Sequence, residues 1–351
     1  MNQVQLRFTC LLIGLMLSLT IPLAQASLEC TDKIQGELKG GDGAGNWWHA
    51  NQSIMGTEIF VELWHVNQLE ACGAIHEVMA EMRRIDFAMS PYKENSLLSR
   101  LNQKGADGPV EVGEELYKLI ASSLEMSKLT AGAFDVTYAS VGRLYDYRSA
   151  VVPTKQEIER RLTSIDYRHV ELHPKTLSIS FKRAGVYLDL GGIAKGYAVD
   201  RGIALLRARG VTQAMVKAGG DSRIIGDRNG EPWVVGIKDP RVEGEMVAVL
   251  PLMNVSVSTS GDYERYFENG GIRYHHIINP KTGDSARQIQ SVTILGDDTL
   301  STDALSTSVF VMGVEKGLDL VNGIDGVDVV IVSGDGDLFY SDSLLSMTAG
   351  R

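Results

Sequence analysis

Helical and strand-like patterns follow one another irregularly along residues 46–351, and this order limits the possible fold more than any other feature. A parallel α/β fold requires a steady alternation of strand and helix, which is missing here. The sequence therefore predicts an α+β fold, with mixed or antiparallel sheets and packed helices, in one domain over residues 46–351. The expected strands are 58–66, 177–181, 185–190, 247–258, 273–278, 291–295, 327–332 and 338–340, and the expected helices are 67–87, 114–129, 154–164, 193–209 and 302–312.

The composition is that of an acidic globular protein. Of 351 residues, 44% are hydrophobic and 22% are charged, so extensive disorder is excluded. The formal net charge is −10, whereas general nucleic-acid binding requires a basic surface that displaces counterions from phosphates. We therefore expect no nucleic-acid partner.

The first 26 residues have the pattern of a secretory signal peptide. Arg7 precedes an apolar run over residues 8–23, and Ala24-Gln25-Ala26 supplies a cleavage site before Ser27. The apolar run is shorter than the about 20 residues of a stable membrane span. We expect a soluble protein exported to the bacterial periplasm. The alternative is an uncleaved segment, through which the protein would associate with the inner membrane.

Residues 27–45 are polar and end in a glycine-rich stretch, which predicts a flexible tether. After cleavage Cys30 and Cys72 remain, and an oxidising compartment would let them pair. Cys72, however, falls at helical spacing with Leu69, Ile75 and Met79. This spacing favours a buried, reduced Cys72 that acts as a small hydrophobe.

The densest group of chemically useful residues lies between 186 and 200. An apolar strand-like run leads to Asp189, Gly191-Gly192 permits a tight turn, and Lys195 lies in the first turn of the next helix. Backbone N–H groups at a helix start attract anions, and the lysine adds a positive charge. The spacing matches neither a Walker A loop nor a GxGxxG fingerprint. An ordinary strand-turn-helix corner explains the pattern equally well.

Asp303 and Thr307 are four residues apart, so on a helix their oxygens lie on the same face. A carboxylate, a hydroxyl and backbone carbonyls form a hard oxygen site that suits Mg²⁺. The simpler interpretation is that Thr302 caps the helix and Asp303 interacts with its positive end. The spacing alone favours this simpler interpretation.

His275 and His276 end a predicted strand that leads into the Asn279-Pro280 turn. Neighbouring side chains on a strand point to opposite faces, so the two histidines are not expected to share a metal. One of them can face a site while the other faces solvent, and a single histidine with a pKa near neutral suits a general base.

Further short segments accompany the three described above. In chain order the set is Met55-Gly56-Thr57, Ser90-Pro91-Tyr92 with Ser96, Leu101-Asn102, residues 132–137, 189–200, 218–221 and 258–263, His276 to Gly283, and residues 303–307. Taken in this order, these segments resemble the ApbE family of exported FAD:protein FMN transferases. Asn279 stands where that family usually has Asp, and the lipobox common in the family is missing.

The resemblance implies that FAD is the substrate and Mg²⁺ the cofactor. In this family FAD is cleaved at its diphosphate, FMN passes to a Thr or Ser hydroxyl of a redox partner subunit, and AMP leaves. By this resemblance His276 and Asp303 would be catalytic. FAD would contact Met55, Tyr92, Ala133, Phe134, Asp135, Asp189, Lys195 and Ile277, and the metal would lie at Gly192, Asp303, Ser306 and Thr307.

Two other functions remain compatible with the same residues. In an Mg²⁺-dependent FAD pyrophosphatase, water would replace the acceptor alcohol, giving free FMN and AMP. A non-catalytic exported flavin-binding protein would hold FAD intact.

Overall fold

A computed structural model describes residues 31–32 and 45–349 of the chain. Its largest sheet has the order β1-β2-β3-β7-β8-β11-β14-β15-β16, and every neighbouring pair is antiparallel. The predicted α+β class is confirmed. The predicted signal peptide and most of the predicted tether lie outside the described residues. The strands of this sheet are β1 Thr31–Asp32, β2 Asn46–Ile54, β3 Thr57–His65, β7 Ala214–Ala218, β8 Asp221–Ile225, β11 Ser256–Gly261, β14 Ile289–Gly296, β15 Asp328–Ser333 and β16 Leu338–Tyr340.

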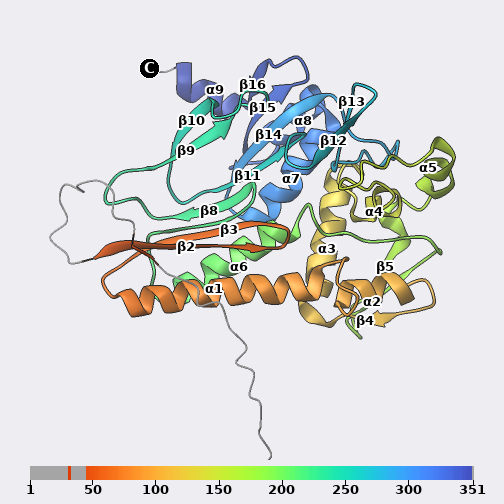
Figure 1. The fold of residues 1–351 in the computed structure, drawn as a ribbon, viewed down its shortest axis with the longest axis horizontal. Helices are drawn as coiled ribbons and strands as arrows, with labels where there is room; N and C mark the ends of the chain where they lie inside the picture. Colours follow the sequence, from red (N-terminus) through yellow and green to blue (C-terminus); the bar gives the residue numbers. More distant parts are fainter. Residues whose placement is uncertain (1–30, 33–44, 350–351) are drawn as a thin grey trace, which may run out of the picture.

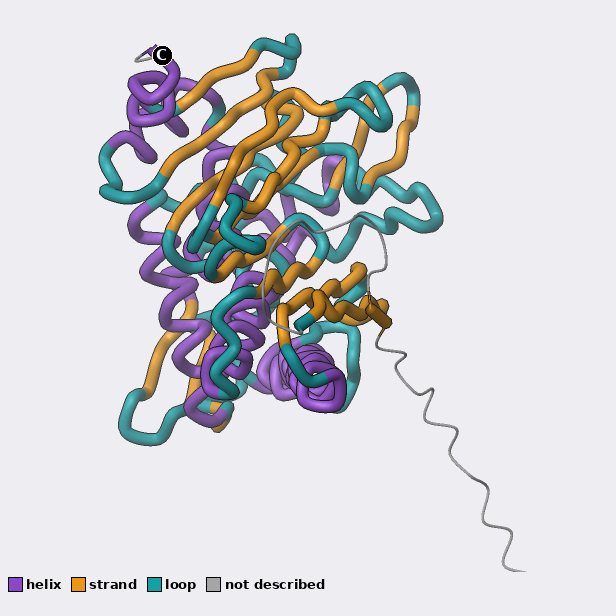
Figure 2. The backbone as a smooth tube through the Cα atoms, turned by 90° about the vertical axis from the view of Figure 1, so that its left-hand side faces the viewer, coloured by secondary structure: helices purple, strands orange, loops and turns teal. Residues whose placement is uncertain are grey.

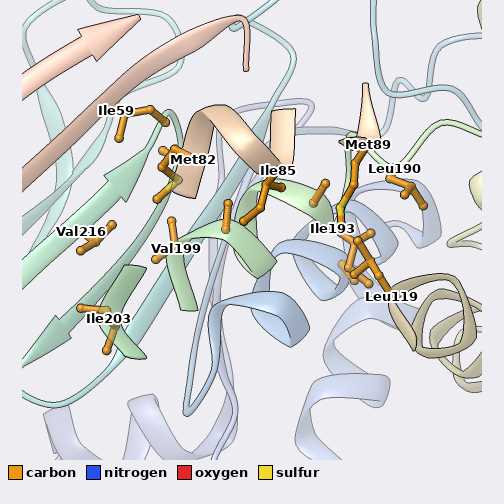
Figure 3. Packing of buried hydrophobic residues seen from close by; sticks show 14 of the residues in the cluster. Ile59, Met82, Ile85, Met89, Leu119, Leu190, Ile193, Val199, Ile203 and Val216 are labelled. Carbon is orange, nitrogen blue, oxygen red and sulfur yellow. The ribbon is translucent and has the colours of Figure 1, made fainter. Parts of the chain in front are cut away.

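One layer of helices packs against the large sheet (Figures 1 and 2). It consists of α1 (Gln68–Met89), α6 (Ala194–Ala208), α7 (Thr299–Met312) and α8 (Val314–Asn322), and each helix contacts the next as well as at least one strand. Figure 3 shows α6 at the centre of this core, where Val199 and Ile203 lie near Met82 of α1 and Val216 of β7. This packing holds the start of α6 beside α7.

The opposite face of the sheet is partly covered by a two-stranded ribbon, β9 (Trp233–Lys238) with β10 (Met246–Leu252). Trp233 of the ribbon meets Trp47 edge-on, with ring centroids 5.1 Å apart. Trp48, the next residue, belongs to the helix-side core because neighbouring strand side chains alternate.

The remaining elements form a lobe beside the sheet and two peripheral pieces (Figure 1). Three of the helices begin at a capping side chain: Asn67 caps α1, Ser96 caps α2, and Thr154 with Glu157 forms a capping box at α5. These elements are α2 Leu97–Lys104, β4 Val110–Glu111, α3 Gly113–Leu129, the 3₁₀ turns η1 Val136–Tyr138 and η2 Tyr167–His169, α4 Ala139–Gly142, α5 Lys155–Leu162, β5 Val170–His173, β6 Ser178–Phe181, the hairpin β12 Tyr266–Asn269 and β13 Ile272–His275, and α9 Asp342–Ala349.

Three predicted elements differ from the structure. The strand expected at 185–190 is extended but joins no sheet, because side chains take the place of a partner strand: Asn102 accepts from Leu188 N at 2.7 Å and donates to Leu188 O at 2.9 Å. The strand expected at 247–258 is two strands, interrupted near Asn254, which has a φ of 50°. The helix expected from 302 begins at Thr299 and is capped by Asp298, so the interpretation of Thr302 as the cap was wrong.

The prediction that Cys72 is a buried, reduced hydrophobe was also wrong. Cys72 is disulfide-bonded and only partly buried, and the other cysteines, Cys10 and Cys30, lie outside the described residues. Leu69 is 84% exposed, so the buried stripe of α1 starts later than the spacing suggested, at Ala71. Within the described part of the chain, none of the helices has both the length and the apolar character needed to span a membrane.

Candidate active site

The centre of the candidate site is a lysine shared by two buried carboxylates. Lys195 Nζ lies 2.5 Å from Asp221 Oδ2, and 3.2 and 3.3 Å from the two oxygens of Asp303. Asp303 also accepts from Gly196 N at 3.0 Å, which joins α7 to the first turn of α6. Burial and the neighbouring Asp221 raise the pKa of Asp303, and the charge of Lys195 opposes that shift.

The start of α7 is fixed by α6. Asp200 of α6 accepts from Thr299 N and Leu300 N, each at 2.9 Å, and receives a hydrogen bond from Arg223 at 2.6 Å. Together with the Asp298 cap, this carboxylate sets the position of every later residue of α7. Asp200 is the last residue of the 186–200 segment that the sequence singled out. Its role in fixing α7 depends on its contacts with Thr299 and Leu300, which are far away in the sequence.

The proposed metal ligands meet where α6 and α7 cross. A Cβ placed on Gly192 would lie 3.2 Å from Thr307 Oγ1, so the glycine backbone and this hydroxyl are in close contact. Asp303 lies one turn earlier on the same helix. Ser306 is buried, and its hydroxyl is engaged in hydrogen bonds within the protein. It donates to Asp303 O at 2.9 Å and lies 2.8 Å from Ser260 Oγ.

This donor set has the chemistry that Mg²⁺ prefers. The carboxylate of Asp303, the hydroxyl of Thr307 and the carbonyl of Gly192 are hard oxygen ligands. The described residues contain no cluster of three or more His, Cys, Asp or Glu side chains. A cation here would thus need oxygens from water and from a bound phosphate, which is how Mg²⁺ commonly binds nucleotides.

Asp189 connects the glycine turn to an exposed tyrosine. Its Oδ1 accepts from Gly191 N at 2.7 Å, and Tyr92 OH donates to its Oδ2 at 3.5 Å. Burial raises the pKa of Asp189, and the Gly191 hydrogen bond opposes that shift. Tyr92 is 80% exposed, so its ring is available to a planar ligand.

Asp135 is buried, and both of its carboxylate oxygens accept hydrogen bonds from backbone N–H groups. Its Oδ1 caps η1 by accepting from Thr137 N at 2.8 Å, and its Oδ2 accepts from Tyr167 N at 2.8 Å. Phe134, next to it, is buried, and its ring lies 3.3 Å from the position that a Gly192 Cβ would take. The structure therefore brings the Phe134 ring beside Gly192, and Asp135 fixes the loop of Ala133 and Phe134.

Met55 and Gly56 form the turn between β2 and β3, with φ angles of 55° and 71°. Two positive φ angles define a type I′ hairpin turn, in which methionine is an unusual choice. Backbone strain of this kind is often found at ligand sites. The turn abuts Gly219, where an added Cβ would lie 2.6 Å from Thr57 Oγ1.

The two histidines have different surroundings, as predicted. His275 is buried, with Nε2 2.5 Å from Ala286 O, and its Nδ1 accepts from Ile277 N at 3.3 Å. His276 is half-buried, and its Nδ1 lies 3.3 Å from Arg265 O. Ile277 is buried in the hydrophobic core.

A carbonyl can only accept, so His276 Nδ1 carries the proton and Nε2 keeps its lone pair. Burial of the ring, together with the charge of Arg265, lowers the pKa of His276 well below its usual value. His276 is therefore a neutral imidazole at physiological pH, the form required of a base.

Known proteins place this chain among flavin transferases. The sequence matches the ApbE family over residues 55–331. The chain belongs to the ApbE family. It is 34% identical to the FAD:protein FMN transferase of Treponema pallidum over 286 residues, which cover 76% of this chain and 78% of that protein. It is 33% identical to the enzyme of the same name from Vibrio cholerae over 275 residues, covering 76% and 82%.

Solved ApbE structures have the same fold. The ApbE protein of Thermotoga maritima superposes with a TM-score of 0.79 at 35% identity, covering 86% of this chain and 98% of that one. The apo flavinyl transferase ApbE of Pseudomonas stutzeri gives a TM-score of 0.76 at 28% identity, covering 88% and 98%.

The one departure from the ApbE pattern at the histidine turn has a structural explanation. Asn279 Oδ1 accepts from Lys281 N at 2.9 Å, and Asn279 O accepts from Gly283 N at 2.8 Å. Asparagine and aspartate both provide this acceptor oxygen.

We therefore expect Asn279→Asp to preserve the turn and to change the rate of FMN transfer by less than about threefold. The measurement is the initial rate of acceptor labelling. Asn279→Leu, which removes the acceptor oxygen, should slow transfer more; equal rates in Asn279→Leu and the wild type would contradict this role.

The close approach of α6 and α7 requires glycine at position 196. An added Cβ would lie 2.1 Å from Thr299 O and 2.8 Å from Asp303 Cβ. We expect Gly196→Ala to lower the free energy of unfolding by about 1–3 kcal/mol or more, because the neighbouring atoms belong to a packed helix. Urea denaturation measures this change.

Gly73→Ala is the matched control, since Gly73 is also helical but an added Cβ would find only Arg209 Nη1, 3.9 Å away. Alanine should leave the stability unchanged or raise it by about 0.5–1 kcal/mol there. Equal stability of Gly196→Ala and the wild type would refute the proposed packing.

Proposed function

We propose that the protein is an Mg²⁺-dependent FAD:protein FMN transferase that acts on an exported acceptor protein. The acceptor hydroxyl oxygen forms a bond to the FMN phosphorus, the bond from that phosphorus to the bridging oxygen breaks, and AMP leaves as an anion. The observation that carries the proposal is the meeting of Asp303, Thr307 and Gly192 beside Lys195, with a neutral His276 on the neighbouring loop. The relatives named above support the same activity.

In this proposal Asp303, Thr307 and the Gly192 carbonyl hold Mg²⁺, with Ser306 supporting them from inside. When bound, Mg²⁺ neutralises the diphosphate charge that repels an incoming oxygen nucleophile. The start of α6 adds positive potential at the same place, and Lys195 offsets part of the negative charge of Asp221 and Asp303.

The flavin and adenine ends of FAD are assigned to the surrounding loops. Tyr92 offers an exposed ring, and Met55 and the loop of Ala133 and Phe134 are assigned to the same ligand. Asp189 orients Tyr92 through the hydrogen bond between them. Asp135 acts indirectly, because it holds the Ala133-Phe134 loop in place.

His276 is the proposed general base. Its Nε2 lone pair would take the proton of the acceptor Thr or Ser hydroxyl as the oxygen attacks phosphorus. The hydrogen bond from Nδ1 to Arg265 O would hold the ring in the required tautomer. AMP is a stable anion, so a strong acid is not needed for its departure.

The acceptor and the location are also proposals. The pattern of residues 1–26 supports export to the periplasm, and the acceptor would be a redox subunit that presents a Thr or Ser. Attachment to the inner membrane would arise only if the signal segment stays uncleaved.

One experiment separates the three candidate functions. The protein is incubated with FAD and Mg²⁺, with and without a flavin-accepting domain. Transfer predicts a fluorescent acceptor band that survives denaturing electrophoresis and disappears with EDTA. Free FMN and AMP without acceptor, and no labelled band with it, would indicate a pyrophosphatase; intact FAD in both reactions would indicate a binding protein.

A further inference from the structure

Arg265 lies at the edge of the candidate site, in the loop between β11 and β12. Its Nη2 atom lies 3.7 Å from the position that a Cβ on Gly56 would take, so the guanidinium rests near the β2–β3 turn. Its backbone carbonyl accepts from His276 N at 3.2 Å and lies 3.3 Å from His276 Nδ1. The residue thus stands between the Met55-Gly56 turn and the proposed base.

The arginine is exposed and its charge is unmatched. Among the residues that the structure describes, no carboxylate oxygen lies within 4.0 Å of the Arg265 guanidinium. Nearby arginines differ, since Arg241 and Arg273 both bind Asp262, and Arg287 binds Asp284. The charge of Arg265 instead acts on groups of the site: it opposes the rise in the pKa of Asp189 and contributes to the lowered pKa of His276.

The charges of the candidate site leave a role for the Arg265 guanidinium. Lys195 contacts two carboxylates, Asp221 and Asp303, so that cluster carries no net positive charge for a ligand. The diphosphate of FAD is a dianion. An arginine guanidinium can donate hydrogen bonds to two phosphate oxygens at once.

We infer that Arg265 is a substrate-binding residue that contacts a phosphate group of the dinucleotide. This inference rests on the proposed function, because it assigns a residue to the same bound FAD. Placed beside His276, the guanidinium would neutralise the phosphate that the acceptor oxygen attacks, and it would hold that phosphorus within reach of the base.

The test compares ligands that share the flavin but differ in phosphate. Dissociation constants for FMN and riboflavin, measured by flavin fluorescence, are compared among the wild type, Arg265→Gln, Arg265→Lys and Arg160→Gln. Arg160 is an exposed arginine of α5 and serves as the matched control. Labelling kinetics with FAD give kcat and KM for the same proteins.

We expect Arg265→Gln to weaken FMN binding by about 10- to 100-fold, the range for a lost hydrogen bond between charged groups. Riboflavin binding should stay within about twofold, Arg265→Lys should be intermediate, and Arg160→Gln should match the wild type. Equal FMN affinity in Arg265→Gln and the wild type, or an equal loss for riboflavin, would overturn the inference. A wild-type protein that neither binds FMN nor labels an acceptor would instead contradict the proposed function.

Discussion

Asp303→Ala is expected to lower the rate of FMN transfer by about a thousandfold. The substitution removes the only carboxylate of the proposed metal site and leaves Lys195 with Asp221 alone. Without the proposed metal, the negative charge of the diphosphate would not be neutralised, which would raise the free energy of the transition state by several kcal/mol. Each increase of about 1.4 kcal/mol slows the reaction tenfold. The measurement is the initial labelling rate at saturating FAD over a range of Mg²⁺ concentrations.

The controls separate metal binding from folding. Asp303→Asn keeps the shape of the side chain and one acceptor for Gly196 N, and it should still require far more Mg²⁺ than the wild type. Asp297→Ala removes an exposed carboxylate just before α7 and should leave the rate unchanged. Full activity of Asp303→Ala at ordinary Mg²⁺ concentrations would eliminate the metal assignment.

His276→Ala is expected to reduce transfer by about 10²- to 10⁴-fold, the usual contribution of a general base. The substitution should leave FAD affinity nearly unchanged, because the ring is assigned to the acceptor hydroxyl. His169→Ala is the matched control: that ring is also half-buried and lies 3.3 Å from a backbone carbonyl, at Thr163. An undiminished rate in His276→Ala would rule out this base.

The pH dependence gives an independent check on His276. A base is active above its pKa, and burial with the Arg265 charge lowers the pKa of His276 below its usual value. The wild-type rate should therefore hold as the pH falls through about 6.5, where an ordinary histidine becomes protonated. A rate that halves near about pH 6.5 and follows one protonation would show that the base is an unperturbed histidine.

Local sequence signals predicted the helices well and the site only in part. The caps at Asn67, Ser96 and Thr154 act within a few residues, so the sequence reveals them. The apolar run at 186–190 has the composition of a strand, but distant side chains such as Asn102 satisfy its backbone and no partner strand is present. Propensity cannot distinguish these two outcomes.

The residues that the sequence did not reveal act through contacts between distant segments. Asp200 holds the start of α7, Asp221 holds Lys195, and Arg265 borders His276. Asp200 and Asp221 lie inside segments already singled out. Their partners are supplied by tertiary packing, of α7 against α6 for Asp200 and of β8 against α6 for Asp221. Arg265 falls between the segment ending at Tyr263 and the one starting at His276, where no motif drew notice to it.

The central claim is that one cation, held by α7, bridges the protein and the FAD diphosphate. The most direct measurement is a crystal structure of the Asn279-containing wild-type chain with FAD and Mn²⁺, in which anomalous scattering locates the metal. We predict a single strong peak within coordination distance of Asp303 and Thr307, next to the FAD diphosphate. A peak elsewhere, or a diphosphate remote from Asp303 and Gly192, would contradict the account.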